Sequence, residues 1–450
     1  MSTQVNDDRT SDDRTADRAP LSWGRRLLGV LVLGGVALIL VGGVAAIFMS
    51  GSGYVPGFSM KTAWEAPHDR AAAEHGNGDW LVGDTVVRSR FDAVTAFDVR
   101  SGKKRWEYVP GRADICSVST AADDSVALIA YGEPDKGCAT VAALDLTNGR
   151  ELWHTSRLPG SADATDVVAT GGGLAVLRDS GGSSEVTESQ KQPGVQAVRA
   201  FDLRTGAPRW KAAVPKGCVP VRVAAAAKQV HAVVACDRDE LKLAAFDPAD
   251  GKERWTVPLD ARRGMAAGTG VSFLSAEPAV VQVGQTQLTD GGAQYLLAFG
   301  QDGRPQGRID LVGGYGRISS EHPAKVSVAD GRLFAVATYE GNQGDWERVV
   351  VFDLATGGEL WRADIAGSWS EIIALHAEGG RVTAVSASSK YNDDVYVFDA
   401  ATGDEEDDRT LRDDVGDYEG DLQDLLTYED LVIAVRWGEG VRPFSAYEPW

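Results

Sequence analysis

The stretch from Val349 to Ile365, VVVFDLATGGELWRADI, decides the fold. It reads as a strand (VVVFD), a tight turn (LATGGE) and a second strand (LWRADI), because branched and aromatic residues flank a glycine-containing centre. The same phrase returns along the chain. Close copies begin at Val94, Val141, Val198 and Leu243, and weaker copies begin at Leu296 and Val395. The chain therefore repeats one hairpin seven times.

The spacing of this repeat indicates the architecture. An aspartate ends the first strand of most copies and recurs about every 45 to 57 residues, with one double interval that holds the Leu296 copy. A strand-rich repeat of about 40 to 50 residues is typical of a β-propeller, in which each repeat forms one blade. The aspartates are Asp98, Asp145, Asp202, Asp247, Asp353 and Asp399.

Each position of the phrase has a physical role. The aspartate can hydrogen-bond the backbone of the turn, and the glycine supplies the positive φ that a tight hairpin turn requires. A tryptophan follows on the second strand, where its flat side chain can fill the wedge between two blades. These tryptophans are Trp106, Trp153, Trp210, Trp255 and Trp361. Gly307 and Asp407 replace the tryptophan in the two weaker copies, so we expect their blades to dock less tightly.

The two ends of the repeat region predict how the ring closes. The chain ends with LVIAVRWGEGVRPFSAYEPW, Leu431 to Trp450, which offers two strands without an outer one. Far upstream, FSMKTAWEAP (Phe58 to Pro67) is an isolated strand that can supply the missing outer strand of the last blade, with Trp64 as a sixth docking tryptophan. Pairing these ends removes exposed sheet edges. The sequence therefore predicts an all-β, eight-bladed β-propeller.

The repeated AFDxxTGxxxW phrase resembles the quinoprotein-type (PQQ-like) propeller repeat. The resemblance covers Phe58 to Trp450 and implies an eight-bladed propeller. The family includes quinoprotein alcohol dehydrogenases, the outer-membrane assembly lipoprotein BamB and extracytoplasmic sensor domains of membrane kinases. One fold serving such different proteins means that the repeat specifies structure far more than function.

The N-terminal region predicts a membrane anchor. Residues 27–48 are 22 residues without a charge, long enough at about 1.5 Å per residue to cross a hydrocarbon core of about 30 Å. Arginines concentrate before this segment, so the positive-inside rule places residues 1–26 in the cytoplasm as a disordered tail. Residues 49–57 then form a linker, and residues 58–450 form an extracytoplasmic propeller. A cleaved signal peptide is the alternative, but its apolar run is usually only about 7 to 15 residues long. No cysteine follows the segment closely, so we expect no BamB-like lipid anchor.

The four cysteines fall into two local pairs, as expected in an oxidising compartment. A hairpin that turns near Ala227 places Cys218 opposite Cys236, which predicts a disulfide. A second bridge between Cys116 and Cys138 requires the intervening loop to fold back. Four buried thiols are the alternative. No CxxC motif or histidine cluster accompanies them, so zinc is not expected.

The sequence contains no pattern typical of catalysis. The resemblance implies a quinone cofactor held against a disulfide between adjacent cysteines, with calcium beside it, but no two cysteines of this chain are adjacent. The six histidines are dispersed without metal or triad spacing, and no catalytic aspartate of the family can be matched. We therefore expect no catalytic, cofactor-binding or metal-binding residues, and disfavour PQQ with calcium.

Charge narrows the range of partners. Acidic residues outnumber basic ones by 65 to 45, giving a formal charge of −20, which disfavours nucleic acid. The segment 403–430 holds 13 acids against two arginines and is expected to be a solvated loop. Two other readings are a docking loop for a basic partner and a calcium site. The candidate calcium ligands are Asp413, Asp414, Asp417, Glu419 and Asp421.

Two further features remain candidates for recognition. The Gly- and Ser-rich segment 178–196 is expected to protrude from the third blade as a flexible loop. Trp346, Trp369 and Trp437 lie outside the docking positions, so they either line a recognition face or pack in the ordinary way.

Three functions stay open at this stage. The favoured one is a single-pass, membrane-anchored propeller that binds a protein or cell-envelope partner as a scaffold. The alternatives are a PQQ-dependent oxidoreductase and a small-ligand sensor that works with a separate partner chain, since 26 residues cannot hold an output domain.

Overall fold

The computed structural model describes residues 35, 41–43, 57–69, 76–133, 138–156, 167–179, 196–236, 240–260, 270–284, 294–341, 344–366, 369–412, 415, 422–438 and 440–450. The chain divides into two units, residues 1–51 and 52–450, and the second is the one with described sheets. The expected tail 1–26 lies outside the described residues, as does the linker 49–57 except for Gly57. The expected membrane segment 27–48 also lies outside them, apart from residues 35 and 41–43. No helix within the described ranges is both long and apolar enough to span a membrane.

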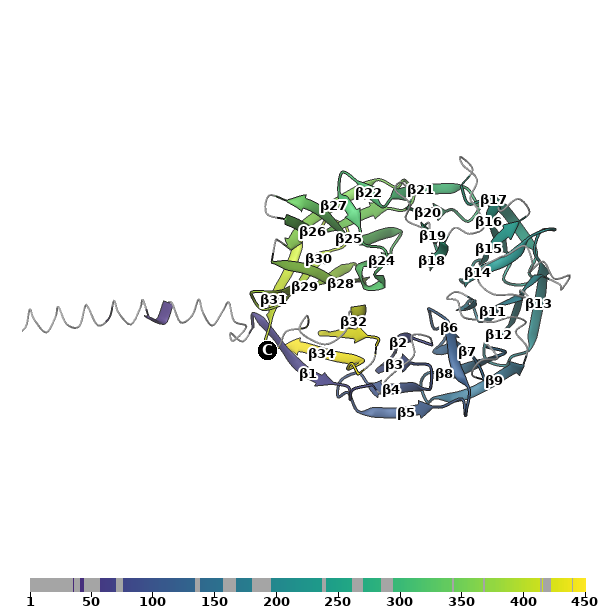
Figure 1. Ribbon diagram of the computed structural model, residues 1–450, viewed down its shortest axis with the longest axis horizontal. Coiled ribbons are helices and arrows are strands. Elements are labelled where there is room, and N and C mark those ends of the chain that lie inside the picture. Colours follow the sequence, from purple (N-terminus) through teal and green to yellow (C-terminus); the bar gives the residue numbers. More distant parts are fainter. Residues whose placement is uncertain are drawn as a thin grey trace, which may run out of the picture. The chain divides into compact units, whose positions relative to one another are not determined.

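Residues 57–450 form an all-β propeller, in which eight groups of strands follow one another around a ring (Figure 1). The strands of each blade are given from the innermost outward. Blade 1 consists of β2 (Gly78–Val82), β3 (Thr85–Ser89), β4 (Val94–Asp98) and β5 (Lys104–Tyr108), and blade 2 consists of β6 (Asp114–Val118), β7 (Val126–Gly132), β8 (Thr140–Asp145) and β9 (Arg150–Ser156). Blade 3 consists of β10 (Val168–Gly171), β11 (Leu174–Asp179), β12 (Ala197–Asp202) and β13 (Pro208–Ala213), and blade 4 consists of β14 (Val219–Ala225), β15 (Val230–Cys236), β16 (Glu240–Phe246) and β17 (Glu253–Pro258).

Blades 5 to 8 continue the same order. Blade 5 consists of β18 (Gly270–Ala276), β19 (Ala279–Gly284), β20 (Tyr295–Phe299) and β21 (Pro305–Asp310), and blade 6 consists of β24 (Val326–Ala329), β25 (Arg332–Gly341), β26 (Gly344–Asp353) and β27 (Glu359–Ala366). Blade 7 consists of β28 (Ser370–Glu378), β29 (Arg381–Ser388), β30 (Asp394–Asp399) and β31 (Glu405–Leu411), and blade 8 consists of β32 (Leu422–Tyr428), β33 (Leu431–Arg436), β34 (Phe444–Pro449) and β1 (Ser59–Glu65). Blade 6 also carries β22 (Val312–Gly313), β23 (Gly316–Ile318) and the short 3-10 helix η2 (Pro323–Lys325).

The first strand completes the last blade, which confirms the predicted closure. β1 pairs antiparallel with β34, with Met60 opposite Pro449 and Trp64 opposite Ala446. β1 also touches β31 of blade 7 in parallel, where Met60 lies opposite Leu411. In Figure 1 the purple first strand lies beside the yellow last strand, and together they close the ring.

The hydrophobic core lies between the blades. Each of eight clusters of buried apolar side chains joins two consecutive blades, so the core is divided into eight wedges. The strands that form these wedges are apolar on both faces, because each inner blade face packs against a neighbouring sheet.

The repeated hairpin is the connection between the third and fourth strand of a blade. In blade 3, Asp202 accepts hydrogen bonds through Oδ1 from the backbone N–H of Thr205 (2.9 Å) and its hydroxyl (2.8 Å). Gly206 then takes φ +69°, which a residue with a side chain rarely adopts. An Arg209 side chain holds the other carboxylate oxygen of Asp202 at 2.5 Å.

Six tryptophans lie where consecutive blades meet. The Trp153 indole of blade 2 donates a hydrogen bond to the carbonyl of Leu203 in the turn of blade 3 (2.8 Å). A Cβ placed on Gly206 would lie 2.7 Å from that indole, so the glycine also makes room for the ring. The other pairs of tryptophan and facing glycine are Trp64 with Gly102, Trp106 with Gly149, Trp210 with Gly251, Trp255 with Gly303, and Trp361 with Gly403.

The two blades without the tryptophan are joined through the main chain. Gly307 donates its own amide N–H to the carbonyl of Leu354 (2.9 Å), which is the turn position that accepts the indole elsewhere. A Cβ on Gly357 would lie 2.6 Å from the Arg308 carbonyl oxygen, so the two backbones touch. At Asp407 the next blade has no hairpin to receive an indole, because its third and fourth strands, β34 and β1, come from opposite ends of the propeller, and β1 pairs with β31 instead. Backbone pairing thus takes the place of the tryptophan at these two junctions, and the looser docking of their blades stays a prediction.

The sequence predicted that the acidic segment 403–430 is a loop, but the structure shows that two parts of it form strands. It contributes β31 to blade 7 and β32 to blade 8, leaving only residues 412–421 between the two strands. The reason is visible in its apolar residues: Leu411, Leu422 and Leu425 are buried between these blades. The high density of charged residues obscured the strand pattern in the sequence.

Candidate functional site

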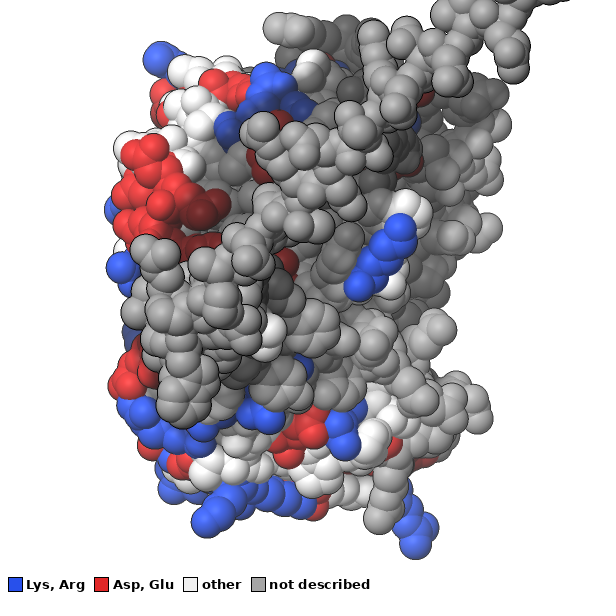
Figure 2. Space-filling view, turned by 90° about the vertical axis from the view of Figure 1, so that its left-hand side faces the viewer, with Lys and Arg blue, Asp and Glu red and all other residues white. Residues whose placement is uncertain are grey.

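The outer edge of blade 7 carries an unusual concentration of negative charge. Five consecutive residues, Asp404 to Asp408, are all exposed, because β31 is the outermost strand of its blade. Figure 2 views the side of the ring on which β31 lies and shows a patch of acidic side chains there with basic side chains around it. We name residues 404–408 the acidic edge.

Only part of this charge is balanced by neighbouring cations. Within the described ranges, Arg381 pairs with Glu406 (2.9 Å) and Arg409 with Asp407 (2.7 Å). No such ion pair involves Glu405 or Asp408 in the described part of the chain. Exposed pairs of this kind are weak, so the edge keeps a strong negative potential.

Nearby groups respond to this potential. Burial raises the pKa of the Asp394 carboxyl to about 6. A hydrogen bond with the Thr410 side chain opposes this rise, and the carboxylates of Asp393 and Asp408 add to it. Burial also raises the pKa of Tyr396 to about 12, with Asp394, Asp408 and Glu405 contributing. The negative field therefore extends from the edge strand into the adjacent strand β30.

The candidate calcium ligands Asp413, Asp414, Asp417, Glu419 and Asp421 lie outside the described residues. The described residues contain no group of three His, Cys, Asp or Glu side chains that could hold a metal ion. The acidic edge itself is a strand whose carboxylates spread along its length. The proposed calcium loop accordingly stays a prediction.

A second acidic feature lies at the innermost strands, where blade 8 meets blade 1. Burial raises the pKa of Asp79, on β2, well above its usual range, and the carboxylate of Asp424, on β32, raises it further; Arg88 opposes both effects. Burial raises the pKa of Asp424 as well, against the backbone N–H of Leu425 and the charge of His376. Two like carboxyls this close favour sharing a proton over both being ionised.

The predicted disulfides are both formed. Cys116 bridges to Cys138 and Cys218 bridges to Cys236, with Cα–Cα distances of 6.2 and 3.9 Å. The second bridge follows from the register of β14 and β15, in which Val219 lies opposite Ala235. Each bridge ties residues of one blade together.

These residues do not fit the quinone site that the resemblance implies. The bridged cysteines are 22 and 18 residues apart in sequence, so neither bridge joins adjacent cysteines. The inner carboxyls Asp79 and Asp424 interact with each other, and in the described part of the chain they are not joined by a third metal ligand. No reaction step through such a cofactor follows from this arrangement.

The three tryptophans outside the docking positions have separate environments. Trp369 is 51% exposed, and the Lys390 ammonium lies 3.1 Å from its ring centroid. Trp346 packs beside Tyr339 on blade 6, with ring centroids 6.5 Å apart. Trp437 lies under the guanidinium of Arg88 (5.9 Å). Two of the three are engaged by cations, and Trp369 alone is strongly exposed. The segment 178–196, also a candidate for recognition, lies outside the described residues except at its two ends.

The sequence could not reveal the acidic edge as a surface. The charges of 404–408 are plain in the sequence, but only the pairing of β31 with β30 shows that they form an exposed strand. The inner pair was missed because Asp79 and Asp424 are separated by almost the whole propeller in sequence. Their only signal was one carboxylate on the innermost strand of blade 1 and one on the innermost strand of blade 8.

Many solved structures are similar to this chain, including one BamB and two quinohemoprotein alcohol dehydrogenases. BamB from Moraxella catarrhalis is 15% identical, with a TM-score of 0.48 over 86% of this chain and 99% of that chain. A quinohemoprotein alcohol dehydrogenase from Pseudomonas putida HK5 is 13% identical, with a TM-score of 0.47 over 86% and 76%. The quinohemoprotein alcohol dehydrogenase from Comamonas testosteroni is 13% identical, with a TM-score of 0.48 over the same shares.

Comparison at the level of sequence gives one family. No curated protein matches the chain. The family described as outer membrane protein assembly factor BamB matches residues 59–196, 185–343 and 345–447. These segments include every blade and far more than half of the chain. On this match and the repeated hairpin behind it, the chain belongs to the BamB family of PQQ-like propeller repeat proteins.

Proposed function

We propose that this protein is a membrane-anchored, extracytoplasmic binding module whose acidic edge docks a basic region of a protein partner. The observation that carries the proposal is the run of five exposed acids at 404–408, of which two are paired with arginine in the described structure. Unbalanced surface charge steers association and selects partners of opposite sign. Membership of a family described by an assembly factor is in keeping with a protein-binding role.

The proposed location rests on the sequence and on the disulfides. An uncharged segment at 27–48 preceded by arginines is suited to a single-pass anchor with a cytoplasmic N-terminus. Two disulfides in one domain are typical of an oxidising compartment outside the cytoplasm. Both features favour a propeller outside the membrane and a short tail inside.

We propose binding rather than catalysis. The oxidoreductase alternative has less support, because neither disulfide joins adjacent cysteines and the two inner carboxyls face each other. The sensor alternative would place a small ligand on the propeller and the output in a separate partner chain.

The test is a crosslinking pull-down from intact membranes with the full-length chain. A variant with Glu405→Gln, Glu406→Gln, Asp407→Asn and Asp408→Asn removes four of the five charges of the acidic edge while keeping the size of its side chains. Deleting 403–430 would be uninformative, because it removes β31 from blade 7 and β32 from blade 8 and so disrupts both blades. We expect a basic partner with the native chain, lost in the variant and weakened by salt.

A matched control removes the same number of exposed acids elsewhere. Glu107→Gln, Asp250→Asn, Glu253→Gln and Asp302→Asn lie on blades 1, 4 and 5 and change the net charge equally. The control should retain the partner. Equal recovery with both variants would show that the acidic edge does not dock it.

A further inference from the structure

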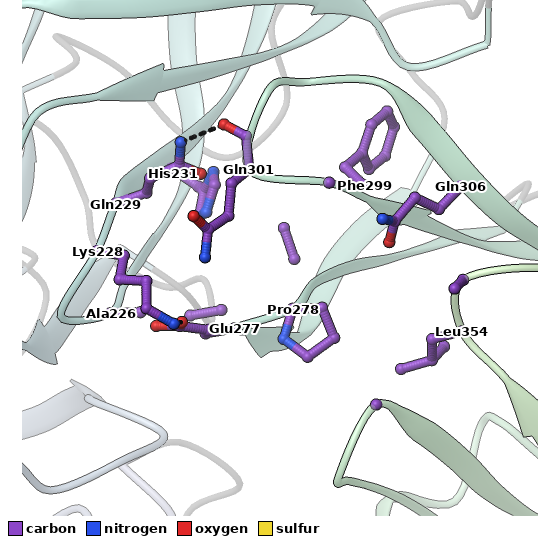
Figure 3. A pocket seen from close by; sticks show the side chains of 15 residues that line it. Ala226, Lys228, Gln229, His231, Glu277, Pro278, Phe299, Gln301, Gln306 and Leu354 are labelled. Carbon is purple, nitrogen blue, oxygen red and sulfur yellow. Dashed lines mark hydrogen bonds and ion pairs between the residues drawn. The ribbon is translucent and has the colours of Figure 1, made fainter.

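A cavity of about 290 Å³ opens among blades 4, 5 and 6 (Figure 3), and no residue of the acidic edge lines it. Its walls come from the turns between the first and second strands of blades 4 and 5 and between the third and fourth strands of blades 5 and 6. Ligand pockets usually measure about 300 to 1,000 Å³, so this one suits a single small molecule.

The cavity exists because these turns are not tied together as they are elsewhere. In five other blades, the residue after the aspartate of the repeated hairpin donates its backbone N–H to a carbonyl in the turn between the first and second strands. Examples are Leu203, which donates to the Gly173 carbonyl (2.9 Å), and Leu354, which donates to the Gly331 carbonyl (3.0 Å). In blade 4 the equivalent residue is Pro248, which has no N–H. In blade 5 it is Gln301, whose N–H forms no such backbone bond within the described ranges. Two consecutive blades therefore leave a gap.

The cavity has no net charge. Lys228 and Glu277, at its edge, form an ion pair with each other. Burial lowers the pKa of His231 to about 4, so this wall residue is neutral at ordinary pH. A charged ligand would lose its hydration here without meeting a free countercharge, which disfavours anions and cations.

The remaining walls combine an apolar surface with two amides. Phe299, Pro278 and Leu354 supply the apolar part. The backbone carbonyl of Gln301 is already engaged, since it accepts from the side chains of Gln229 (2.5 Å) and Trp255 (2.8 Å). The side-chain amides of Gln301 and Gln306 extend toward the middle of the cavity from opposite sides (Figure 3). Each amide can both donate and accept hydrogen bonds.

We propose that this cavity binds an uncharged, hydroxyl- and amide-bearing ligand of monosaccharide size, oriented by the side chains of Gln301 and Gln306. The apolar wall packs against one face of the ligand, and the two amides bind its polar edge. This site is independent of the proposed docking at the acidic edge, so either can fail alone.

The experiment is a saturation-transfer NMR titration of the full-length chain in detergent micelles with three sugars of one size. N-acetylglucosamine is neutral, glucosamine is a cation and glucuronic acid is an anion. We expect N-acetylglucosamine to bind at least tenfold more tightly than either charged sugar. Absence of binding, or equal binding of all three, would overturn the proposal.

Variants test the two amides. The double substitution Gln301→Ala with Gln306→Ala should weaken N-acetylglucosamine binding at least tenfold, because both side chains are exposed and the fold does not depend on them. Gln294→Ala is the matched control and should bind as the native chain does, because Gln294 directly precedes β20, whose opposite end lines the cavity. Binding that persists unchanged in the double variant would place the sugar elsewhere.

Gln306→Glu sharpens the test of charge. It keeps the size of the side chain but adds a negative charge and removes the amide donor. We expect weaker N-acetylglucosamine binding and stronger glucosamine binding, a reversal that a purely structural role of Gln306 would not produce. An unchanged order of the three sugars would contradict the assigned role.

Discussion

The junction between blades 3 and 4 and the junction between blades 5 and 6 solve one problem in two ways. At the first, the indole of Trp210 crosses to the next blade and donates to the carbonyl of Pro248 (2.8 Å). At the second, Gly307 stands where the tryptophan would be, and its backbone N–H donates to the equivalent carbonyl of Leu354 (2.9 Å). The feature that both junctions keep is the hydrogen bond into the turn, whichever atom donates it.

The difference changes what each junction tolerates. A tryptophan junction holds two backbones apart with a ring, so it is vulnerable to loss of atoms. The glycine junction brings two backbones into contact, so it is vulnerable to added atoms. The same repeat therefore has opposite size requirements at equivalent positions.

The largest effect is expected from Trp210→Ala. Removing the indole leaves a void between blades 3 and 4 next to Gly251 and Phe246, and breaks the bond to Pro248. We expect the free energy of unfolding to fall by about 3 kcal/mol, measured by urea denaturation. Trp369→Ala removes an exposed indole outside the junctions and should cost less than about 1 kcal/mol. Equal losses would show that the junction is not special.

Gly307→Ala tests the opposite requirement. A Cβ at this position would lie 2.5 Å from the Leu354 carbonyl oxygen and 2.6 Å from the Gly357 nitrogen, and backbone cannot move aside as a side chain can. We expect a loss of about 2 kcal/mol in the same measurement. Gly314→Ala, where no atom lies within 4 Å, is the control and should be close to neutral. A neutral Gly307→Ala would mean that the blades separate easily.

A pair of phenylalanine substitutions isolates the hydrogen bond from the ring. Trp210→Phe loses both indole area and the bond to Pro248, whereas the Trp106 nitrogen has no hydrogen-bond partner among the described residues. We expect Trp210→Phe to destabilise the protein by about 1 kcal/mol more than Trp106→Phe. If the two variants melt alike, the bond into the turn contributes nothing.

The smallest effect concerns the turn carboxylates and appears only in acid. The hydrogen bond from Arg209 lowers the pKa of the Asp202 carboxyl to about 2. Asp202 therefore binds a proton less readily in the folded protein than in the unfolded protein. Its contribution to stability is therefore present above about pH 4 and is lost as the pH falls toward 2. Asp202→Asn should show a shallower fall in melting temperature over that range, worth less than about 1 kcal/mol because the pair is partly exposed. Parallel curves for the variant and the native chain would contradict this.

The sequence was sufficient for the features that repeat. The repeated phrase, which includes Trp153 and Gly206, predicted the hairpin, the ring and the docking tryptophans. It could do so because each blade packs against a neighbouring blade that is built from the same repeat. It could not show that the carbonyl of Leu203 receives the indole, since acceptor and donor lie in different repeats. Gly307 looked like a defect for the same reason: its partner, Leu354, belongs to the next blade.

The candidate sites were less accessible to prediction. The strand nature of 404–408 was hidden because acids are rare in strands, and only buried Leu411 and Leu422 reveal that both sides of the segment belong to blades. The cavity beside Gln301 and Gln306 is built from turns of three blades. The cavity arises in part because Pro248 lacks a backbone N–H. The importance of this residue becomes clear only from the hydrogen bond that the equivalent residue donates in other blades.

The pairing of β1 with β34 also fixes when this protein can be finished. Blade 8 takes its outer strand from the start of the propeller and its other three strands from the end. During synthesis, blades 1 to 7 can form in order, but β1 has no antiparallel partner until the residues around Tyr447 have been made. The ring therefore stays open during translation and can close only after the strand that pairs with β1 has been made.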